Sequence, residues 1–328
     1  MGSQLAQAFP GKPTFTEDSF PSQEGKVFLV TGGYSGIGLE LARMLYRKKG
    51  RVYIAGRSEE KAKQAIKDIR GGAASSDGTL EFLHVELDDL TSIKSFVDSF
   101  KAKESKLNVL WNNAGVSQPP VGSVSMQNIE LQLATNCLGP FLLTQMLLPL
   151  LEATAADETA NPPGSVRVVW ASSQMTELSA PTGGIIMSEI TDPPQDKTRN
   201  YTNSKTGNMF LAAELAHRAG AAAGGKIVSV SHNPGSCNSS LFRHTPVLRF
   251  LARPVLHKPE LGALTSLYCG LSSDITLENN GCHVVPWGKI GGELREDLKE
   301  ALKTKEDGGS GRAKEFWEFC EEKTQQYK

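Results

Sequence analysis

The chain has 328 residues, of which 39% are hydrophobic and 22% are charged, and this composition excludes wholesale disorder and a collagen-like chain. Its 35 basic and 36 acidic residues give a net charge of -1. That balance argues against a protein built mainly to bind phosphodiester backbones, so we expect no nucleic-acid partner.

Cysteine and histidine spacing predicts neither a disulfide framework nor a metal site. The five cysteines are widely spaced without a CxxC pair, and the six histidines show no HExxH spacing. We therefore expect a reducing, cytoplasmic setting. The most apolar stretch, residues 138–151, is interrupted by glycine, proline and polar residues, so we expect a core helix and no integral membrane segment.

Short apolar runs alternate along the chain with segments of helical period, and no internal repeat is apparent. In chain order we expect a strand at 26–31, a helix at 37–49, a strand at 52–55, a helix at 59–70, a strand at 80–86, a helix at 92–101, a strand at 107–111, a long helix at 126–153, a strand at 166–171, a helix at 202–219, a strand at 226–231, a helix at 259–271 and a strand at 282–285.

Strands that are apolar throughout and joined by helices predict an α/β fold: a doubly wound (Rossmann) parallel sheet with helices on both faces, in a single domain. We divide the chain into an N-terminal extension at 1–24, a dinucleotide-binding and catalytic Rossmann domain at 25–290, and a C-terminal helical tail at 291–328 packed on that domain. Ligands of such a sheet bind in the crevice at the carboxyl ends of its strands.

A glycine-rich turn, TGGYSGIG at residues 31–38, lies between the first strand and the first helix. Gly32 permits the tight turn, Gly36 lets the backbone approach a pyrophosphate, and Gly38 allows the helix to pack closely on the strand. The N–H groups that open the helix, at the positive end of its dipole, then face the phosphates, and these include Ser35 and Ile37.

The residue after the second strand indicates which dinucleotide is bound. An NAD site usually has a carboxylate there for the ribose 2′-hydroxyl, whereas this chain has Arg57. A guanidinium pairs bidentately with a 2′-phosphate, and Lys61, one turn later, could assist. We predict NADP(H) as the cofactor; the alternative is that Arg57 is an ordinary surface charge.

Tyr201 and Lys205 form a candidate acid/base pair at the start of an expected helix. Their spacing of four places both side chains on one face, one turn apart. A free tyrosine has a pKa of about 10, and a nearby ammonium favours the phenolate and lowers that pKa. Taken alone, this spacing is common by chance, and a surface pair is the alternative.

Five motifs stand in an order that resembles the short-chain dehydrogenase/reductase family, over residues 25 to 290. Within the family, the chain resembles fungal members similar to retinol dehydrogenases, through its long insertion between serine and tyrosine, its HNPG turn and its VVPWGKIG segment. The five motifs are TGxxxGxG at 31–38, NNAG at 112–115, the pair Ser172-Ser173 after a strand, Tyr201…Lys205, and Asn233-Pro234-Gly235.

The resemblance implies roles for four catalytic residues. Tyr201 would be the general acid in reduction and the base in oxidation, and Lys205 would lower its pKa and hold the nicotinamide ribose. Ser173, rather than Ser172, would bind and orient the substrate oxygen. Asn136 would support a water near the lysine for proton relay.

The resemblance also implies further contacts with the cofactor. Asp88 would contact the adenine, and Asn113 would lie along the cofactor beside the fourth strand. Pro234 and Gly235 would open the turn over the nicotinamide. Ser239 stands where the family often has a threonine touching the carboxamide, a departure that keeps the hydroxyl.

These roles imply an NADPH-dependent oxidoreductase that interconverts a carbonyl and an alcohol, as a monomer or homodimer. We expect the loops at 174–200 and 240–258 to select the substrate, and we interpret 241–257 as a mobile lid whose apolar inner face favours an apolar small molecule. The alternative for this segment is a helix that lies on a membrane surface. Two alternatives are an NADP(H)-binding non-redox enzyme, such as an isomerase or cyclase, and a cofactor-responsive interaction module. The intact set of four catalytic residues argues against the interaction module.

Overall fold

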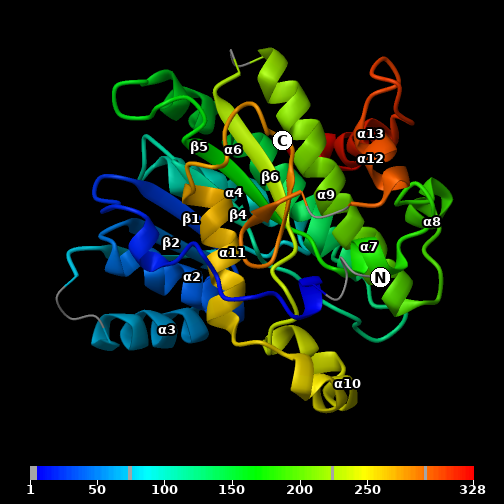
Figure 1. The fold of residues 1–328 in the computed structure, drawn as a ribbon, viewed down its shortest axis with the longest axis horizontal. Coiled ribbons are helices and arrows are strands. Elements are labelled where there is room, and N and C mark those ends of the chain that lie inside the picture. Colours follow the sequence, from blue (N-terminus) through cyan, green and yellow to red (C-terminus); the bar gives the residue numbers. More distant parts are fainter. Residues whose placement is uncertain (1–5, 73–75, 223–224, 292–293) are drawn as a thin grey trace.

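The protein folds around one eight-stranded sheet with the strand order β3-β2-β1-β4-β5-β6-β7-β8 (Figure 1). The computed structural model describes residues 6–72, 76–222, 225–291 and 294–328. Every strand pair is parallel except β7 with β8. The strands are β1 Val27–Thr31, β2 Arg51–Gly56, β3 Thr79–His84, β4 Val109–Asn112, β5 Val166–Ala171, β6 Ile227–His232, β7 His283–Val285 and β8 Lys289–Ile290.

Helices cover both faces of this sheet, which is why its strands are apolar throughout. On one face α2, α3 and α11 share a buried apolar cluster with the strands, and on the other face α4, α6 and α9 share a second (Figure 1). This arrangement confirms the doubly wound Rossmann sheet. The main helices are α2 Gly36–Arg47, α3 Glu59–Gly72, α4 Leu90–Lys101, α6 Gly139–Ala156, α9 Lys197–Ala222 and α11 Pro259–Leu271.

The long helix predicted at 126–153 begins later than predicted and is not uniform. The Ser125 hydroxyl accepts hydrogen bonds from the backbone of Gln127 and Ile129, and Asn128 has a φ of 58°, so the chain turns here instead of coiling. The Glu130 carboxylate then caps the first helical turn. The helical stretch consists of α5 Leu131–Leu133, a π-helical turn at Ala134–Leu138, and α6.

Several short elements were not predicted, because they are too short to carry a periodic signal. Two of them, α7 and α8, lie near or within the segment expected to be a loop before Tyr201. The unpredicted elements are α7 Met175–Ser179, α8 Met187–Thr191, α10 Pro246–Ala252, β8 and α12 Glu296–Leu302.

The C-terminal helix α13, Arg312–Thr324, packs on α9 and α6. A Cβ at Gly207 would lie 2.7 Å from the Phe316 ring, so the missing side chain lets the two helices approach closely. Trp317 stacks edge-on against Phe141 at 4.8 Å and under the guanidinium of Arg218 at 4.9 Å. The tail is therefore part of the same core as the sheet.

The segment interpreted as a lid, residues 241–257, contains the short helix α10, which protrudes at the bottom of Figure 1. Its apolar side chains Val247, Phe250 and Leu251 are exposed, Phe250 by 73%. In this structure these three side chains of α10 face solvent, and short 3-10 turns at Ser240–His244 and Arg253–Val255 flank the helix.

One stretch of the described chain, Leu131–Ala156, has the length and composition that would suffice to cross a membrane. In this fold, 67% of its most apolar window is buried by the rest of the protein. It is thus a core helix, as predicted for 138–151.

Candidate active site

The Tyr201 hydroxyl, the Ser173 hydroxyl and the Lys205 amine meet beside the carboxyl end of β5. Tyr201 is buried in the first turns of α9 and hydrogen-bonds the Ser173 side chain. Lys205, one turn later, places its amine 5.9 Å from the Tyr201 ring centroid. That amine donates to the carbonyl of Ala171, the last residue of β5, at 2.8 Å. Ser172 instead donates its hydroxyl to the Lys205 carbonyl, so it anchors the helix.

Burial shifts the pKa values of this pair in opposite directions. It raises the pKa of Tyr201 to about 12, and the hydrogen bond with Ser173 offsets this only in part. It lowers the pKa of Lys205 to about 8. The prediction that Lys205 lowers the pKa of Tyr201 is therefore wrong for the protein by itself, because desolvation of the phenolate dominates.

The π-helical turn places Asn136 behind this pair. Its amide NH₂ donates to the Val116 carbonyl at 3.0 Å and to the Ser204 hydroxyl at 2.9 Å, and its Oδ1 accepts from the Val116 N–H at 2.8 Å. A Cβ at Gly115 would lie 3.1 Å from Asn136 Oδ1 and 3.3 Å from Lys205 Nζ. Gly115 therefore leaves the space in which the Asn136 oxygen and the lysine amine approach one another.

The glycine turn takes the shape that its sequence predicts. Gly32 and Gly36 have φ values of 68° and 54°, which favour glycine. A Cβ at Gly38 would lie 2.5 Å from the Gly32 carbonyl oxygen, so α2 can pack on β1 only with glycine there. A Cβ at Gly36 would lie 2.9 Å from Cβ of Ser239, which places the segment after β6 directly across the turn.

Thr31 links the glycine turn to the end of β4. Its buried hydroxyl accepts from the backbone N–H groups of Asn113 and Ala114, at 3.0 and 2.9 Å, and donates to the Trp111 carbonyl at 3.2 Å. The Asn113 amide returns a hydrogen bond to the Thr31 carbonyl at 2.9 Å. Asn113 thus holds the two strands together at the point where the strand order reverses.

Two of the residues predicted at the adenosine end form an ion pair. Arg57 Nη1 lies 3.7 Å from the Asp88 carboxylate, and the Arg57 side chain is 58% exposed. Arg243, from the segment after β6, has its pKa lowered by burial and further by the positive charge of Arg57. Lys61 is exposed in the first turn of α3 and donates its backbone N–H to Ser58.

The turn at Pro234 and Gly235 is fixed by a hydrogen bond from its own backbone to Asn233 and by packing against Trp287. The Asn233 side chain accepts from the Gly235 N–H at 2.9 Å. Gly235 has a φ of 78°, and a Cβ there would lie 2.8 Å from the Trp287 ring. Ser239, four residues on, accepts from the Leu241 N–H and so begins the next helical turn.

Other reactive groups do not form a second constellation in the described part of the chain. All five cysteines are free, and burial raises the pKa of each thiol, with Cys282 at about 11. Cys137 is a buried core residue that donates to the Ser204 carbonyl. Among the residues described, His, Cys, Asp and Glu side chains form no group that could hold a metal ion.

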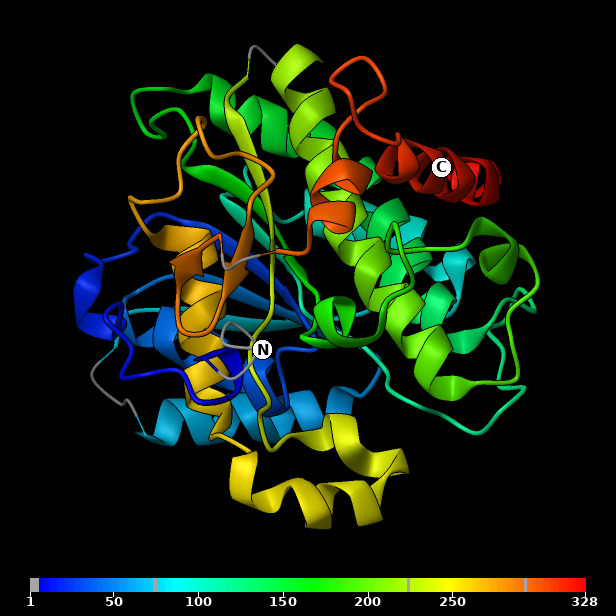
Figure 2. The ribbon, with the colours of Figure 1, turned by 45° about the vertical axis from the view of Figure 1, so that its right-hand side comes forward.

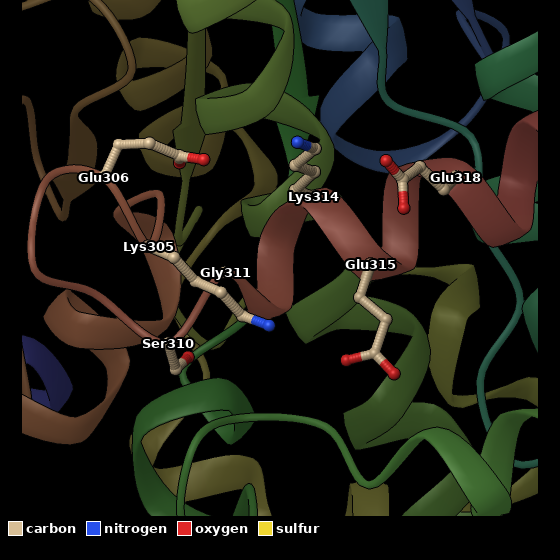
Figure 3. Close-up of a pocket in the computed structure, with 7 residues that line it drawn as sticks. All are labelled: Lys305, Glu306, Ser310, Gly311, Lys314, Glu315 and Glu318. Carbon is tan, nitrogen blue, oxygen red and sulfur yellow. The ribbon is translucent and has the colours of Figure 1, made fainter.

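A surface hollow of about 260 Å³ lies at the C-terminal tail (Figure 3). Its charged lining comes from α13 and the loop before it. It is separate from the residues around Tyr201, and we assign it no role in the reaction. The hollow is lined by Lys305, Glu306, Ser310, Gly311, Lys314, Glu315 and Glu318.

Comparison with known proteins agrees with this geometry. Residues 26–161 match the family model described as short chain dehydrogenase. A short-chain dehydrogenase/reductase of Phomopsis amygdali is 43% identical, covering 98% of this chain and 96% of that protein. A short-chain dehydrogenase/reductase of Pestalotiopsis fici is 42% identical, covering 96% of this chain and 95% of that protein. The chain belongs to the short-chain dehydrogenase/reductase family.

A solved structure supports the same assignment of fold. An uncharacterized protein from Mycobacterium paratuberculosis superposes with a TM-score of 0.69 and 25% sequence identity, covering 95% of this chain and 97% of that one. Members of the family are oxidoreductases that bind NAD(P). The glycine cradle fits such a cofactor, and so does the Lys205 amine, which has one hydrogen-bond acceptor within the described ranges and donors to spare.

Sequence reasoning missed four residues that shape this site. Thr31 and Gly115 fall inside recognised motifs, so their spacing marked them, although their contacts could not be foreseen. Ser204 joins the Asn136 amide to the Tyr201 carbonyl, to which its hydroxyl donates at 2.8 Å. Arg243 carried no signal beyond its charge, because it approaches Arg57 only through the fold.

We expect Thr31→Val to destabilise the protein by about 2 kcal/mol, because it removes the acceptor of two backbone N–H groups at nearly constant volume. Thr31→Ser keeps the hydroxyl and is the matched control. Free energies of unfolding from urea titration measure the difference between them. Equal stability of the valine variant and the native protein would contradict the described role of the hydroxyl.

Proposed function

We propose that this protein is an NADP(H)-dependent reductase that converts a carbonyl group of an apolar small molecule to an alcohol. The observation that carries the proposal is the buried contact between the Tyr201 and Ser173 hydroxyls beside the Lys205 amine. When bound, the nicotinamide supplies the hydride. The residues of this chain would supply position, electrostatics and the proton.

The raised pKa of Tyr201 keeps the phenol in the protonated form that reduction uses. A phenol whose pKa is about 12 is protonated at neutral pH, so it holds the proton that reduction consumes, although it is a weaker acid than a free phenol. As negative charge develops on the substrate oxygen, the Tyr201 and Ser173 hydroxyls donate to it. One such donor is typically worth about 3 to 4 kcal/mol in the transition state.

Lys205 and Asn136 would replace the proton that Tyr201 gives up. The lysine ammonium has donors left after its bond to the Ala171 carbonyl, and these suit ribose hydroxyls. Both N–H groups of the Asn136 amide are occupied, so it can hold a water only through Oδ1, which faces the lysine side of Gly115. A water held there would connect the amine to solvent.

Preference for NADP(H) rests on the basic groups at the adenosine end. Arg57 stands where an NAD site would have a carboxylate, and Arg243 adds a second guanidinium nearby. Asp88, which pairs with Arg57, would contact the adenine. A 2′-phosphate would offset the mutual repulsion of the two guanidinium groups.

We expect Tyr201→Phe to lower turnover by at least about a hundredfold, because it removes the proton donor and leaves the fold intact. NADPH affinity, measured by fluorescence titration, should stay nearly the same, since the glycine turn is untouched. Turnover is measured as loss of NADPH absorbance with a panel of ketones and aldehydes. Turnover close to native in this variant would overturn the proposed mechanism.

The rate of reduction should fall as pH rises through about 8. The lowered pKa of Lys205, about 8, makes this side chain a charged ammonium below pH 8 and a neutral amine above pH 8. Tyr201 stays protonated on both sides of that pH. Lys205→Arg keeps its charge throughout this range, so the fall should disappear even if the absolute rate is lower. The measurement is kcat/KM for the carbonyl from pH 6 to 10. The same fall in the arginine variant would exclude the lysine as its cause.

Arg57→Ala should weaken NADPH binding about ten- to hundredfold and leave NADH binding nearly unchanged, because a charge-assisted hydrogen bond to a phosphate is lost. Lys63→Ala, which removes an exposed cation of α3 paired with Glu59, is the control. Dissociation constants for the two cofactors decide the matter. A native preference for NADH, or equal weakening of both, would refute the assignment.

A further inference from the structure

The described beginning of the chain lies against the active-site edge of the sheet. Residues 6–8 form a helical turn. Figures 1 and 2 show this dark blue turn beside α7 and the carboxyl end of β6. An extension that precedes the domain in sequence thus reaches the place where the reaction is proposed to occur.

Gln7 connects two segments at that edge, α7 and the turn after β6. Its side chain is only 4% exposed. Its amide nitrogen donates to Glu177 Oε1 at 3.0 Å, and its amide oxygen accepts from the Asn233 side chain at 2.9 Å. Glu177 and Asn233 are themselves 5% and 2% exposed, so both hydrogen bonds are shielded from water.

The amide oxygen of Gln7 is bonded to the turn that would cover the nicotinamide. The Asn233 side chain uses its oxygen to accept from Gly235 N–H and its nitrogen to donate to Gln7. Its backbone N–H donates to the Val284 carbonyl of β7 at 2.9 Å. Removing the Gln7 amide would leave a buried donor of Asn233 without this acceptor and release one end of the turn.

The amide nitrogen of Gln7 is bonded to α7, the helix that follows Ser173. Glu177 lies in α7, whose first turn is fixed by the Met175 N–H donating to the Ser173 hydroxyl at 3.2 Å. At its far end, the Ser179 hydroxyl hydrogen-bonds that of Thr202, next to Tyr201, at 2.9 Å. A shift of α7 would therefore move Ser173 relative to Tyr201.

Ala8, the residue after Gln7, has a separate hydrogen bond to the body of the protein. His257 donates its Nε2–H to the Ala8 carbonyl at 2.9 Å, and its ring stacks edge-on against Trp287 at 5.0 Å. Trp287 is the ring that packs on Gly235. The extension is thus attached to α7, to the turn after β6 and to the segment before α11.

We propose that Gln7 is a positioning residue of the reaction: it fixes the distance between the Ser173 segment and the Asn233–Gly235 turn, and the N-terminal extension forms one wall of the substrate site. The proposal rests on the proposed carbonyl reduction for its kinetic consequence. The link between the two segments stands on the hydrogen bonds alone. Substrate geometry is sensitive to such links, because a misplacement of about 1 Å can cost about a hundredfold in rate.

The test uses three variants of the full chain. Gln7→Met keeps the length of the side chain and removes both hydrogen bonds. The double variant Gln7→Glu with Glu177→Gln rebuilds them, because the new carboxylate at position 7 accepts from Asn233 and from the new amide at position 177. Lys12→Ala, at an exposed residue of the same extension, is the control.

Two readouts separate positioning from general stability. We expect Gln7→Met to lower kcat for the carbonyl about tenfold or more with NADPH affinity nearly unchanged, to lower the thermal midpoint by a few degrees because two buried hydrogen bonds are lost, and the double variant to recover most of both losses. Hydrogen exchange should speed up at 175–179 and at 233–236 in the methionine variant alone. Native kcat and exchange in that variant, or no recovery in the double variant, would overturn the proposal.

The two proposals fail in different ways. If the native protein binds NADPH but reduces no carbonyl compound, the proposed function fails, and hydrogen exchange at the two segments alone then decides whether Gln7 links them. If the native protein is active and Gln7→Met is equally active, the wall and its positioning residue fail while the reductase assignment stands.

Discussion

The burial of Tyr201 and Lys205 against the end of β5 is the constraint on which the site depends. Desolvation opposes charge on both groups, so it raises the pKa of the phenol and lowers that of the amine. The phenol is then protonated at neutral pH, and burial brings the pKa of the amine down to about 8. The Ala171 carbonyl accepts from the amine, and the missing side chain at Gly115 leaves the amine the space it occupies near Asn136.

The sheet supplies the rest of the geometry. Parallel strands end at a common edge, and the strand order reverses between β1 and β4, which opens a crevice there. The Thr31 hydroxyl closes the gap between these two strands, and the glycines of the following turn allow α2 to approach. Arg57 follows β2, and Tyr201 lies in the helix whose Lys205 is bonded to the end of β5, so both lie at this edge of the sheet.

The fold was readable in the sequence because it rests on local pattern: apolar strands, and glycines at a strand–helix turn. The Tyr-x-x-x-Lys spacing likewise indicated that Tyr201 and Lys205 lie one turn apart on one helix. The π turn that holds Asn136 and the start of the helical stretch at Leu131 were not readable, since they arise from side-chain competition and tertiary packing. The pKa of Tyr201 was predicted in the wrong direction, because sequence reveals its neighbouring amine but not its burial. Gln7 gave no signal at all; its partners lie 170 and 226 residues away.

The most direct test of the central claim is a crystal structure of the protein with NADP⁺ bound. The nicotinamide ring is expected beside the Tyr201 hydroxyl, with the ribose hydroxyls on Lys205, leaving room for a carbonyl carbon about 3 to 3.5 Å from the reactive ring carbon. A dinucleotide whose nicotinamide lies away from Tyr201, with the phenol facing only protein, would contradict it.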